Sequence, residues 1–88
     1  LLDLREPVDE HAAPEQRLED RQLLDAVHAA IARLEPDARA VLVLRDLEDL
    51  SGEQTAEIIG VPLATMKTRL HRARRAVREE LIRRGVAH

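Results

Sequence analysis

The sequence predicts an all-α fold of four helices, and two observations support this class. Apolar residues recur every three or four positions in four separate stretches, which is the period of a helix with one buried face. Prolines, glycines and a capping sequence stand where these stretches begin and end. Each apolar stripe needs a neighbour to cover it, so we expect one small domain of four packed helices and no sheet.

The first 14 residues contain two prolines and scattered acids without a sustained apolar period. We therefore expect residues 1–14 to form a disordered acidic linker or tail. The first helix is expected from about Glu15 to Leu34. Its apolar stripe consists of Leu18, Leu23, Leu24, Val27, Ala30, Ile31 and Leu34.

Pro36 suits the first position of the second helix, because the fixed φ of proline matches a helix and its missing N–H is not needed there. Asp37 places negative charge in the first turn, where the helix dipole favours it. We expect this helix to end at about Leu47. The residues expected to point inward are Val41, Leu42 and Leu44.

The third helix has the clearest start, because Ser51 and Gln54 form an S-x-x-Q capping box. Gly60 suits the left-handed conformation that ends it. Pro62 is expected to open the fourth helix, which runs to about Arg84 and ends at Gly85. The inner stripe of this helix is Leu63, Met66, Leu70, Ala73, Val77 and Leu81.

The last two helices and the glycine between them are expected to form a helix-turn-helix over residues 51–75, within a DNA-binding domain spanning 15–88. Ala56, Gly60 and Met66 have the spacing that lets two helices pack at a steep angle. The second helix of this motif enters the major groove of B-DNA, with its N-terminal residues facing base edges.

Charge is segregated along the chain. Residues 1–62 carry 6 basic and 15 acidic side chains, whereas residues 63–88 carry 8 basic and 2 acidic ones. The net charges of −9 and +6 matter more for an encounter with phosphates than the total of −3. The basic part of the chain therefore has the field expected of a double-stranded DNA-binding helix.

A polar face lies opposite the inner stripe of the fourth helix. Lys67 and Arg72 can donate to guanine, and Thr68 can bond a base edge or offer its methyl group to thymine. Flanking arginines, including Arg74 and Arg78, suit phosphates, as do Thr65 and the free N–H groups at the helix start. The residues expected to contact DNA are Thr65, Lys67, Thr68, Arg69, His71, Arg72 and Arg75.

Several other functions are disfavoured by composition. The chain has no aromatic residue to stack on single-stranded bases and no cysteine for a disulfide or thiolate site. Its four histidines lack metal-ligand spacing, so we expect no enzyme, metal or cofactor. No apolar run approaches the ~18 residues of a membrane span, so we expect a cytoplasmic protein. Because the chain starts at Leu1, we expect a segment of a longer protein.

Simpler explanations exist for the charged residues. Arginine-rich helix faces are most often solvated surface, and an i,i+4 pair such as Arg75–Glu79 is routine. The acidic residues Asp46, Glu48 and Asp49 are expected to form a solvated corner at the end of the second helix. The charge stripe alone therefore predicts DNA contact less strongly than its combination with the helix-turn-helix.

The motifs L-S-x-E-x-x-A-E-I-I-G-V-P and T-M-K-T-R-L-H-R-A-R-R-A resemble region 4 of bacterial sigma factors, above all the extracytoplasmic-function (ECF) group. The resemblance covers about residues 18–82. It implies a winged-helix-like fold of the sigma region 4 type and recognition of the −35 promoter element within RNA polymerase holoenzyme. It also implies that the β flap of the polymerase binds the apolar surface of the first three helices. Many relatives are held inactive by an anti-sigma factor, so the resemblance suggests such a protein as a further partner.

The sequence departs from the family pattern at several positions. Gly52 stands where an aromatic residue is common, Thr55 where isoleucine is usual, and Met66 where valine is usual. One alternative is a LuxR-type response-regulator domain, although its recognition helix is shorter. The other is a sigma-like mimic that binds an anti-sigma factor, although a mimic has no need of DNA-facing cations.

Overall fold

The computed structural model describes residues 14–86, and within them it contains helices and no strand. The predicted all-α class with four helices is confirmed. The tail expected over residues 1–14 lies, apart from Pro14, outside the described residues. A π-helical turn, η1, continues α2. The elements are α1 (Pro14–Ala32), α2 (Pro36–Leu42), η1 (Val43–Leu47), α3 (Gly52–Ile59) and α4 (Leu63–Arg83).

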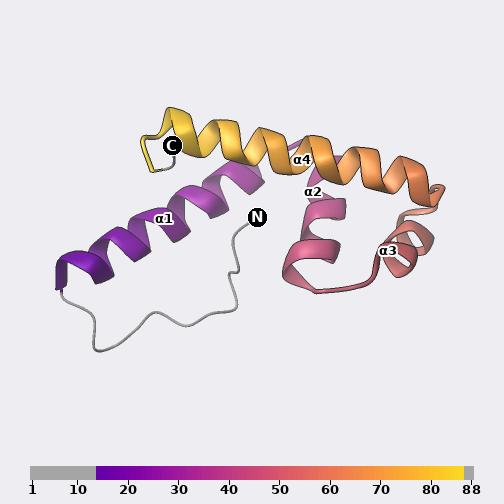
Figure 1. Cartoon of the computed structure of the whole chain (residues 1–88), viewed down its shortest axis with the longest axis horizontal. Helices are drawn as coiled ribbons and strands as arrows, with labels where there is room; N and C mark the ends of the chain where they lie inside the picture. The colour runs from indigo at the N-terminus through magenta and orange to yellow at the C-terminus, as the bar shows by residue number, and fades with distance from the viewer. Residues whose placement is uncertain (1–13, 87–88) are drawn as a thin grey trace.

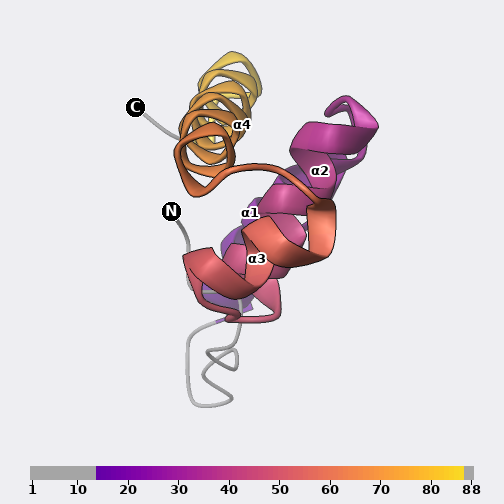
Figure 2. The same cartoon turned by 90° about the vertical axis from the view of Figure 1, so that its right-hand side faces the viewer.

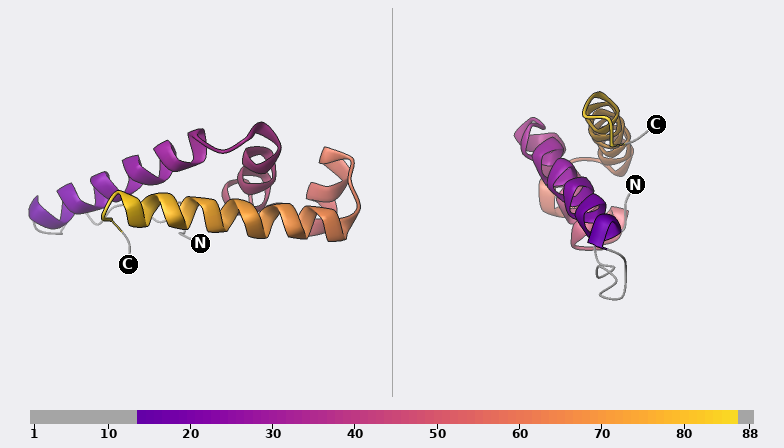
Figure 3. Two further views of the ribbon diagram at one scale, coloured as in Figure 1. Left: turned by 90° about the horizontal axis from the view of Figure 1, so that it is seen from above. Right: turned by 90° about the vertical axis from the view of Figure 1, so that its left-hand side faces the viewer.

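The last helix, α4, contacts all three other helices. Its C-terminal half lies side by side with α1, and the two helices run in opposite directions (Figures 1 and 3). The short helices α2 and α3 pack against its N-terminal half and cross it steeply (Figures 1 and 2). The helix-turn-helix therefore occupies one end of α4, and α1 supports the other end. No helix in the described part of the chain is both long and apolar enough to span a bilayer.

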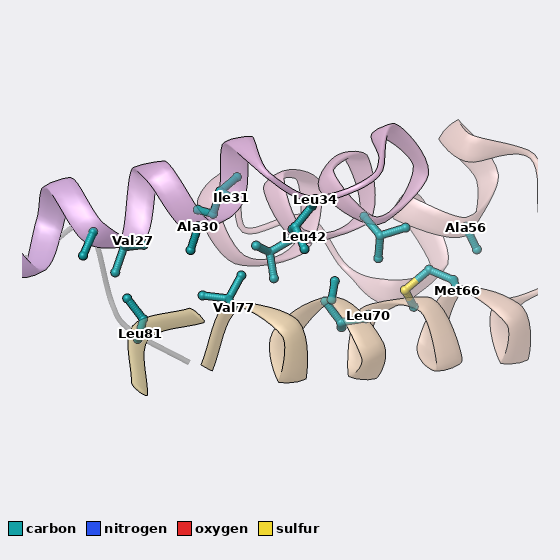
Figure 4. Packing of buried hydrophobic residues seen from close by; sticks show 13 residues of the cluster. Val27, Ala30, Ile31, Leu34, Leu42, Ala56, Met66, Leu70, Val77 and Leu81 are labelled. Carbon is teal, nitrogen blue, oxygen red and sulfur yellow. The ribbon is translucent and has the colours of Figure 1, made fainter. Parts of the chain in front are cut away.

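The hydrophobic core is a row of aliphatic side chains between α4 and the other helices (Figure 4). The predicted inner stripe of α4 is confirmed, with Leu63 half-buried at its start and the other five members buried. Burying one such side chain stabilises the fold by roughly 1.5–3 kcal/mol. The side chains with at most 1% exposure from the apolar set are Val27, Val41, Leu42, Met66, Ala73 and Val77.

Three of the predicted apolar positions lie outside the core: Leu18, Leu24 and Leu44, of which Leu24 is half-buried. Leu18 is 56% exposed, because α1 extends past the C-terminal end of α4 and no described helix covers its first turns (Figures 1 and 3). Leu44 is half-buried and does not pack against the core cluster, whereas its half-buried neighbours Val43 and Leu47 do. The wider π-helical turn, in which the Glu48 N–H donates to the Val43 carbonyl at 2.8 Å, changes which residues face inward.

The helix ends of the helix-turn-helix follow the predicted local chemistry. The Gln54 N–H donates to Ser51 Oγ at 3.0 Å, and the Ser51 N–H donates to Gln54 Oε1 at 2.9 Å, so the capping box is complete. Gly60 ends α3 with a φ of +74°, the left-handed conformation that glycine adopts without strain. Pro62 is the N-cap of α4 and not its first residue, so α4 begins one position later than predicted.

The C-terminal end of α1 is capped by a side chain from α2. The guanidinium of Arg39 donates to the carbonyl groups of Ile31, Ala32 and Leu34 at 3.3, 2.8 and 2.9 Å. The Ile31 carbonyl also accepts from the Leu34 N–H at 3.1 Å, and a cation is favoured at this end of the helix dipole. Arg39 thereby fixes the angle between α1 and α2.

Candidate nucleic-acid interface

The predicted DNA-facing residues lie on the solvent side of α4. Five of them are exposed, whereas Thr65 and Arg69 are half-buried. Their neighbours along the helix, Met66, Leu70 and Ala73, are buried with 1–6% exposure. The helix therefore separates an apolar face from a polar face, as its 3.6-residue period predicts. The five exposed residues are Lys67, Thr68, His71, Arg72 and Arg75.

The structure divides the predicted residues into two rows. Thr65, Thr68, Arg69 and Arg72 line a shallow open depression together with Ala64. Their spacing of three, one and three residues keeps them on one side of the helix. The other predicted residues, Lys67, His71 and Arg75, do not line the depression and form a parallel row of i,i+4 neighbours.

The ion pairs distinguish two kinds of cation on α4. Residues 63–78 contain six basic side chains and no acidic one. Two of the six have carboxylate partners, as described below. Among the described residues, the other four make no side-chain hydrogen bond or ion pair and are available to an anionic partner. These four are Lys67, Arg69, Arg72 and Arg78.

The start of α4 also favours an anion. No side chain caps the first turn, because the N-cap residue is Pro62. The N–H groups of a first helical turn have no carbonyl partners within the helix, and the helix dipole adds partial positive charge there. Thr65 lies in this turn and lines the depression. A phosphate at this end would therefore meet backbone donors as well as side chains.

The hydroxyl group of Thr68 is already hydrogen-bonded within α4, which limits what it can offer to an external group. Its hydroxyl donates to the carbonyl of Ala64 at 3.1 Å, one turn earlier in α4. The proton is thereby used within the helix. The exposed Thr68 side chain is left with its γ-methyl group and the lone pairs of its oxygen as contacts for an external group.

Arg74, which the sequence suggests as a phosphate contact, has a carboxylate partner in the structure. Its Nε donates to Asp46 Oδ2 at 2.9 Å, and its Nη2 donates to Asp46 Oδ1 at 2.5 Å. This hydrogen bond to Asp46 raises the pKa of Arg74 above its ordinary value, against the opposing effect of burial. The Asp46 side chain is only 13% exposed, so the solvated acidic corner predicted there is wrong for Asp46, whereas Glu48 and Asp49 are exposed as expected. The acid instead serves as the partner of an arginine 28 residues later.

Arg75 forms the i,i+4 pair with Glu79 that is expected of a surface helix. The Arg75 Nε lies 3.2 Å from Glu79 Oε1, with the two side chains 72% and 53% exposed. Such exposed pairs stabilise a protein by only about 0–1 kcal/mol. Breaking this pair would therefore cost little free energy, so the Arg75 guanidinium remains available to an external anion.

Glu80 is a buried charge that the sequence did not single out. Its side chain is 10% exposed and accepts hydrogen bonds from Arg83 at 2.6 Å and Arg84 at 3.1 Å. Arg33, in the turn after α1, lies 3.7 Å away. The hydrogen bond from Arg83 is the main cause that lowers the pKa of Glu80, and burial opposes it. Glu80 thus links the turn after α1 to α4. It also pairs with Arg83 and Arg84, the basic residues that follow the exposed face of α4.

Comparison with known proteins identifies the domain. Residues 24–77 match the family described as Sigma-70, region 4. The chain is 41% identical over 68 residues to the ECF RNA polymerase sigma factor SigE of Mycolicibacterium smegmatis, covering 77% of this chain and 26% of that protein. It is 40% identical over 80 residues to the RNA polymerase sigma-E factor of Streptomyces coelicolor, covering 91% and 42%.

A third relative is the ECF RNA polymerase sigma factor SigW of Bacillus subtilis, with 35% identity over 68 residues, 77% of this chain and 36% of that protein. The chain thus spans less than half the length of the curated relatives it matches. The match covers the capping box, the glycine turn and the exposed face of α4 up to Val77. The chain belongs to the sigma-70 region 4 family.

Proposed function

We propose that this chain recognises the −35 element of promoters as the C-terminal domain of an alternative sigma factor of the ECF group. In that role it directs RNA polymerase to sites of transcription initiation. The observation that carries the proposal is the stretch 63–78, which has six basic residues, no acid and four cations without a partner among the described residues. Family membership favours this function over that of a response-regulator domain.

The proposal assigns two kinds of contact to α4. Arg72 and Lys67 donate to guanine in the major groove, and Thr68 contacts a thymine methyl group. Thr65, Arg69, His71 and Arg75 contact phosphates, which fix the position of the helix on the duplex without reading sequence. Phosphate replaces Glu79 as the partner of Arg75, which is inexpensive because that pair is exposed.

We also propose protein partners. The apolar surface of α1 to α3 binds the β flap of the RNA polymerase core, with Ile58 of α3 as the first side chain to test because it is 62% exposed. An anti-sigma factor is a further proposed partner. The domain acts in the cytoplasm by binding, without a catalytic step or cofactor. A sigma-like mimic would need the same apolar surface but no unpaired cations on α4.

The function is tested by selecting from a randomised double-stranded DNA pool with the chain at low salt. We expect a short motif of the −35 type, and Arg72→Ala is expected to weaken binding to it by roughly 1–3 kcal/mol. Arg83→Ala is the matched control, because Arg83 lies on the same helix but is bound to Glu80. With about five phosphates neutralised, affinity is expected to fall a few hundredfold between 50 and 200 mM salt. A flat salt response would contradict DNA binding.

The polymerase partner needs a separate experiment. Ile58→Glu is expected to weaken binding of the chain to an isolated β flap fragment, while DNA selection by the same variant is unchanged. Ile82→Glu, at an exposed isoleucine on α4 outside this surface, is the matched control. Equal binding of the flap by the wild-type chain and the Ile58 variant would place the flap contact elsewhere.

A further inference from the structure

We propose that Asp46 and Arg74 are a positioning pair for the recognition helix. Arg74 lies within the arginine run that is proposed to bind DNA, yet it acts by fixing α4 against η1 and makes no contact with DNA. The inference rests on the proposed function, since it concerns how α4 is presented to the major groove. It assigns a role in DNA specificity to two residues outside the exposed face.

Helix geometry first separates Arg74 from its basic neighbours. Residues two apart on an α-helix are rotated by about 200°, so Arg72 and Arg74 point to nearly opposite sides of α4. Arg72 is exposed and lines the open depression. Arg74 is half-buried and faces η1, where both Nε and Nη2 bond to the two oxygens of Asp46. Within residues 72–75, Arg74 is therefore paired with Asp46 and Arg75 with Glu79, whereas Arg72 has no carboxylate partner among the described residues.

The bidentate geometry fixes direction as well as distance. Two parallel N–H···O bonds hold the planar guanidinium and the carboxylate in one relative orientation. The Asp46 carboxylate is 13% exposed, and removing the guanidinium would leave that charge poorly solvated and without its cation. A phosphate would have to compete with this pair for Arg74, whereas Arg75 is held only by the exposed carboxylate of Glu79. Phosphate is therefore expected to take Arg75 and leave Arg74 in place.

The position of Asp46 makes the pair relevant to both helices of the motif. The preceding residue, Arg45, donates from Nη1 to the carbonyl of Leu50 at 2.8 Å. Leu50 directly precedes Ser51, the N-cap of α3. The turn η1 is therefore bonded to the start of α3 through one side chain and to the middle of α4 through the next. Together these bonds fix the recognition helix relative to the helix that precedes it.

The test compares Arg74→Gln, Arg74→Lys and Asp46→Asn in the full chain. Each variant is titrated with the DNA site selected by the wild type and with a scrambled duplex, over a range of salt concentrations. Thermal unfolding is recorded for each variant, so that affinities are compared where the protein is folded. Arg75→Gln and Arg75→Lys are the matched controls on the adjacent residue.

We expect all three pair variants to lower the ratio of selected to scrambled affinity by roughly tenfold, the size of one lost base contact. The salt dependence on scrambled DNA is expected to stay unchanged, because no phosphate contact is lost. Arg74→Lys is expected to lower the ratio as much as Arg74→Gln does, since an ammonium group cannot form the two parallel bonds. Exchanging the partners in Asp46→Arg/Arg74→Asp is expected to restore part of the ratio. Arg75→Gln should instead reduce the salt slope by about 0.9.

Three outcomes would overturn the inference. If Arg74→Gln weakens both duplexes equally and lowers the salt slope while Arg74→Lys behaves as wild type, Arg74 is a phosphate contact. If only the unfolding temperature changes, the pair supports the fold without orienting α4 for reading. If the wild-type chain shows no salt-dependent DNA binding, the proposed function itself is wrong and this inference is wrong with it.

Discussion

The ε-methyl group of Met66 lies against the backbone of Gly52. A β-carbon added at Gly52 would be 3.1 Å from Met66 Cε and 3.4 Å from Leu63 Cδ1. Gly52 is the first residue of α3, and the other two residues belong to the first turn of α4. The two helices of the motif are therefore in contact where α3 has no side chain, and Met66, with 1% exposure, occupies the adjacent space.

This contact predicts that Gly52→Val destabilises the domain. The valine side chain would overlap the Met66 methyl group, and overpacking of this kind typically costs about 1–3 kcal/mol. The change is measured as the free energy of unfolding in urea. Glu53→Val is the matched control, because it introduces the same residue at the next, exposed position of α3. Equal effects of the two variants would show that the gap beside Gly52 tolerates a side chain.

The same contact predicts coupling between the two positions. Met66→Ala alone removes a buried side chain and is expected to cost about 2–5 kcal/mol. In the double variant Gly52→Val/Met66→Ala, the valine can fill part of the cavity. The combined loss is therefore expected to be smaller than the two single losses together by about 0.5–3 kcal/mol. Strict additivity would mean that the residues do not share this space.

The features predicted correctly from the sequence depend on neighbouring residues. The capping box needs only Ser51 and Gln54, three positions apart, and the turn needs only the left-handed φ of Gly60. The inner stripe of α4 follows from the helical period. These signals specify the helix-turn-helix and the side of α4 that faces solvent, which is why five of the seven predicted side chains are exposed.

The features that were missed depend on residues far apart in the chain. The helical period separates the directions of the basic side chains, but the partner of Arg74 is an aspartate 28 residues earlier on a π-helical turn, which no local pattern indicates. In the sequence Glu80 resembles a surface acid among arginines, and only the fold brings Arg33, from the turn after α1, beside it. Leu18 belongs to the correct stripe, but its burial would require a longer α4. Periodicity predicts which face is apolar and not how far a partner helix extends.

The capping box predicts a measurable effect on stability. Ser51→Ala removes the acceptor for the Gln54 N–H and should lower the free energy of unfolding by about 1 kcal/mol. Ser51→Asp retains an acceptor at the N-cap and is expected to lose less. Both variants are measured by urea denaturation at neutral pH. A loss as large for aspartate as for alanine would contradict a capping role for this side chain.

Glu80 predicts a stability change in acid. Because its pKa in the folded protein lies below the ordinary value of about 4.3, its charged form stabilises the fold above the unfolded pKa. This contribution is lost as the pH falls through the folded pKa. Between pH 5 and more acidic conditions, the unfolding free energy of the wild type is therefore expected to fall more steeply than that of Glu80→Gln. Glu79→Gln, at the exposed neighbour, should follow the wild type; parallel curves for all three would rule out a role for Glu80.

The hydrogen bond of Thr68 within α4 leads to a prediction about which part of its side chain contacts a base. Its hydroxyl proton is already donated to the Ala64 carbonyl, so the γ-methyl group is the contact expected at a thymine methyl. Thr68→Val keeps that methyl group, whereas Thr68→Ser removes it, and burying one such group contributes about 0.8 kcal/mol, roughly fourfold in affinity. Repeating the randomised DNA selection with each variant should preserve the thymine preference for valine and weaken it for serine. The opposite result would show that Thr68 reads a donor on a base through its oxygen, because serine keeps that oxygen and valine does not.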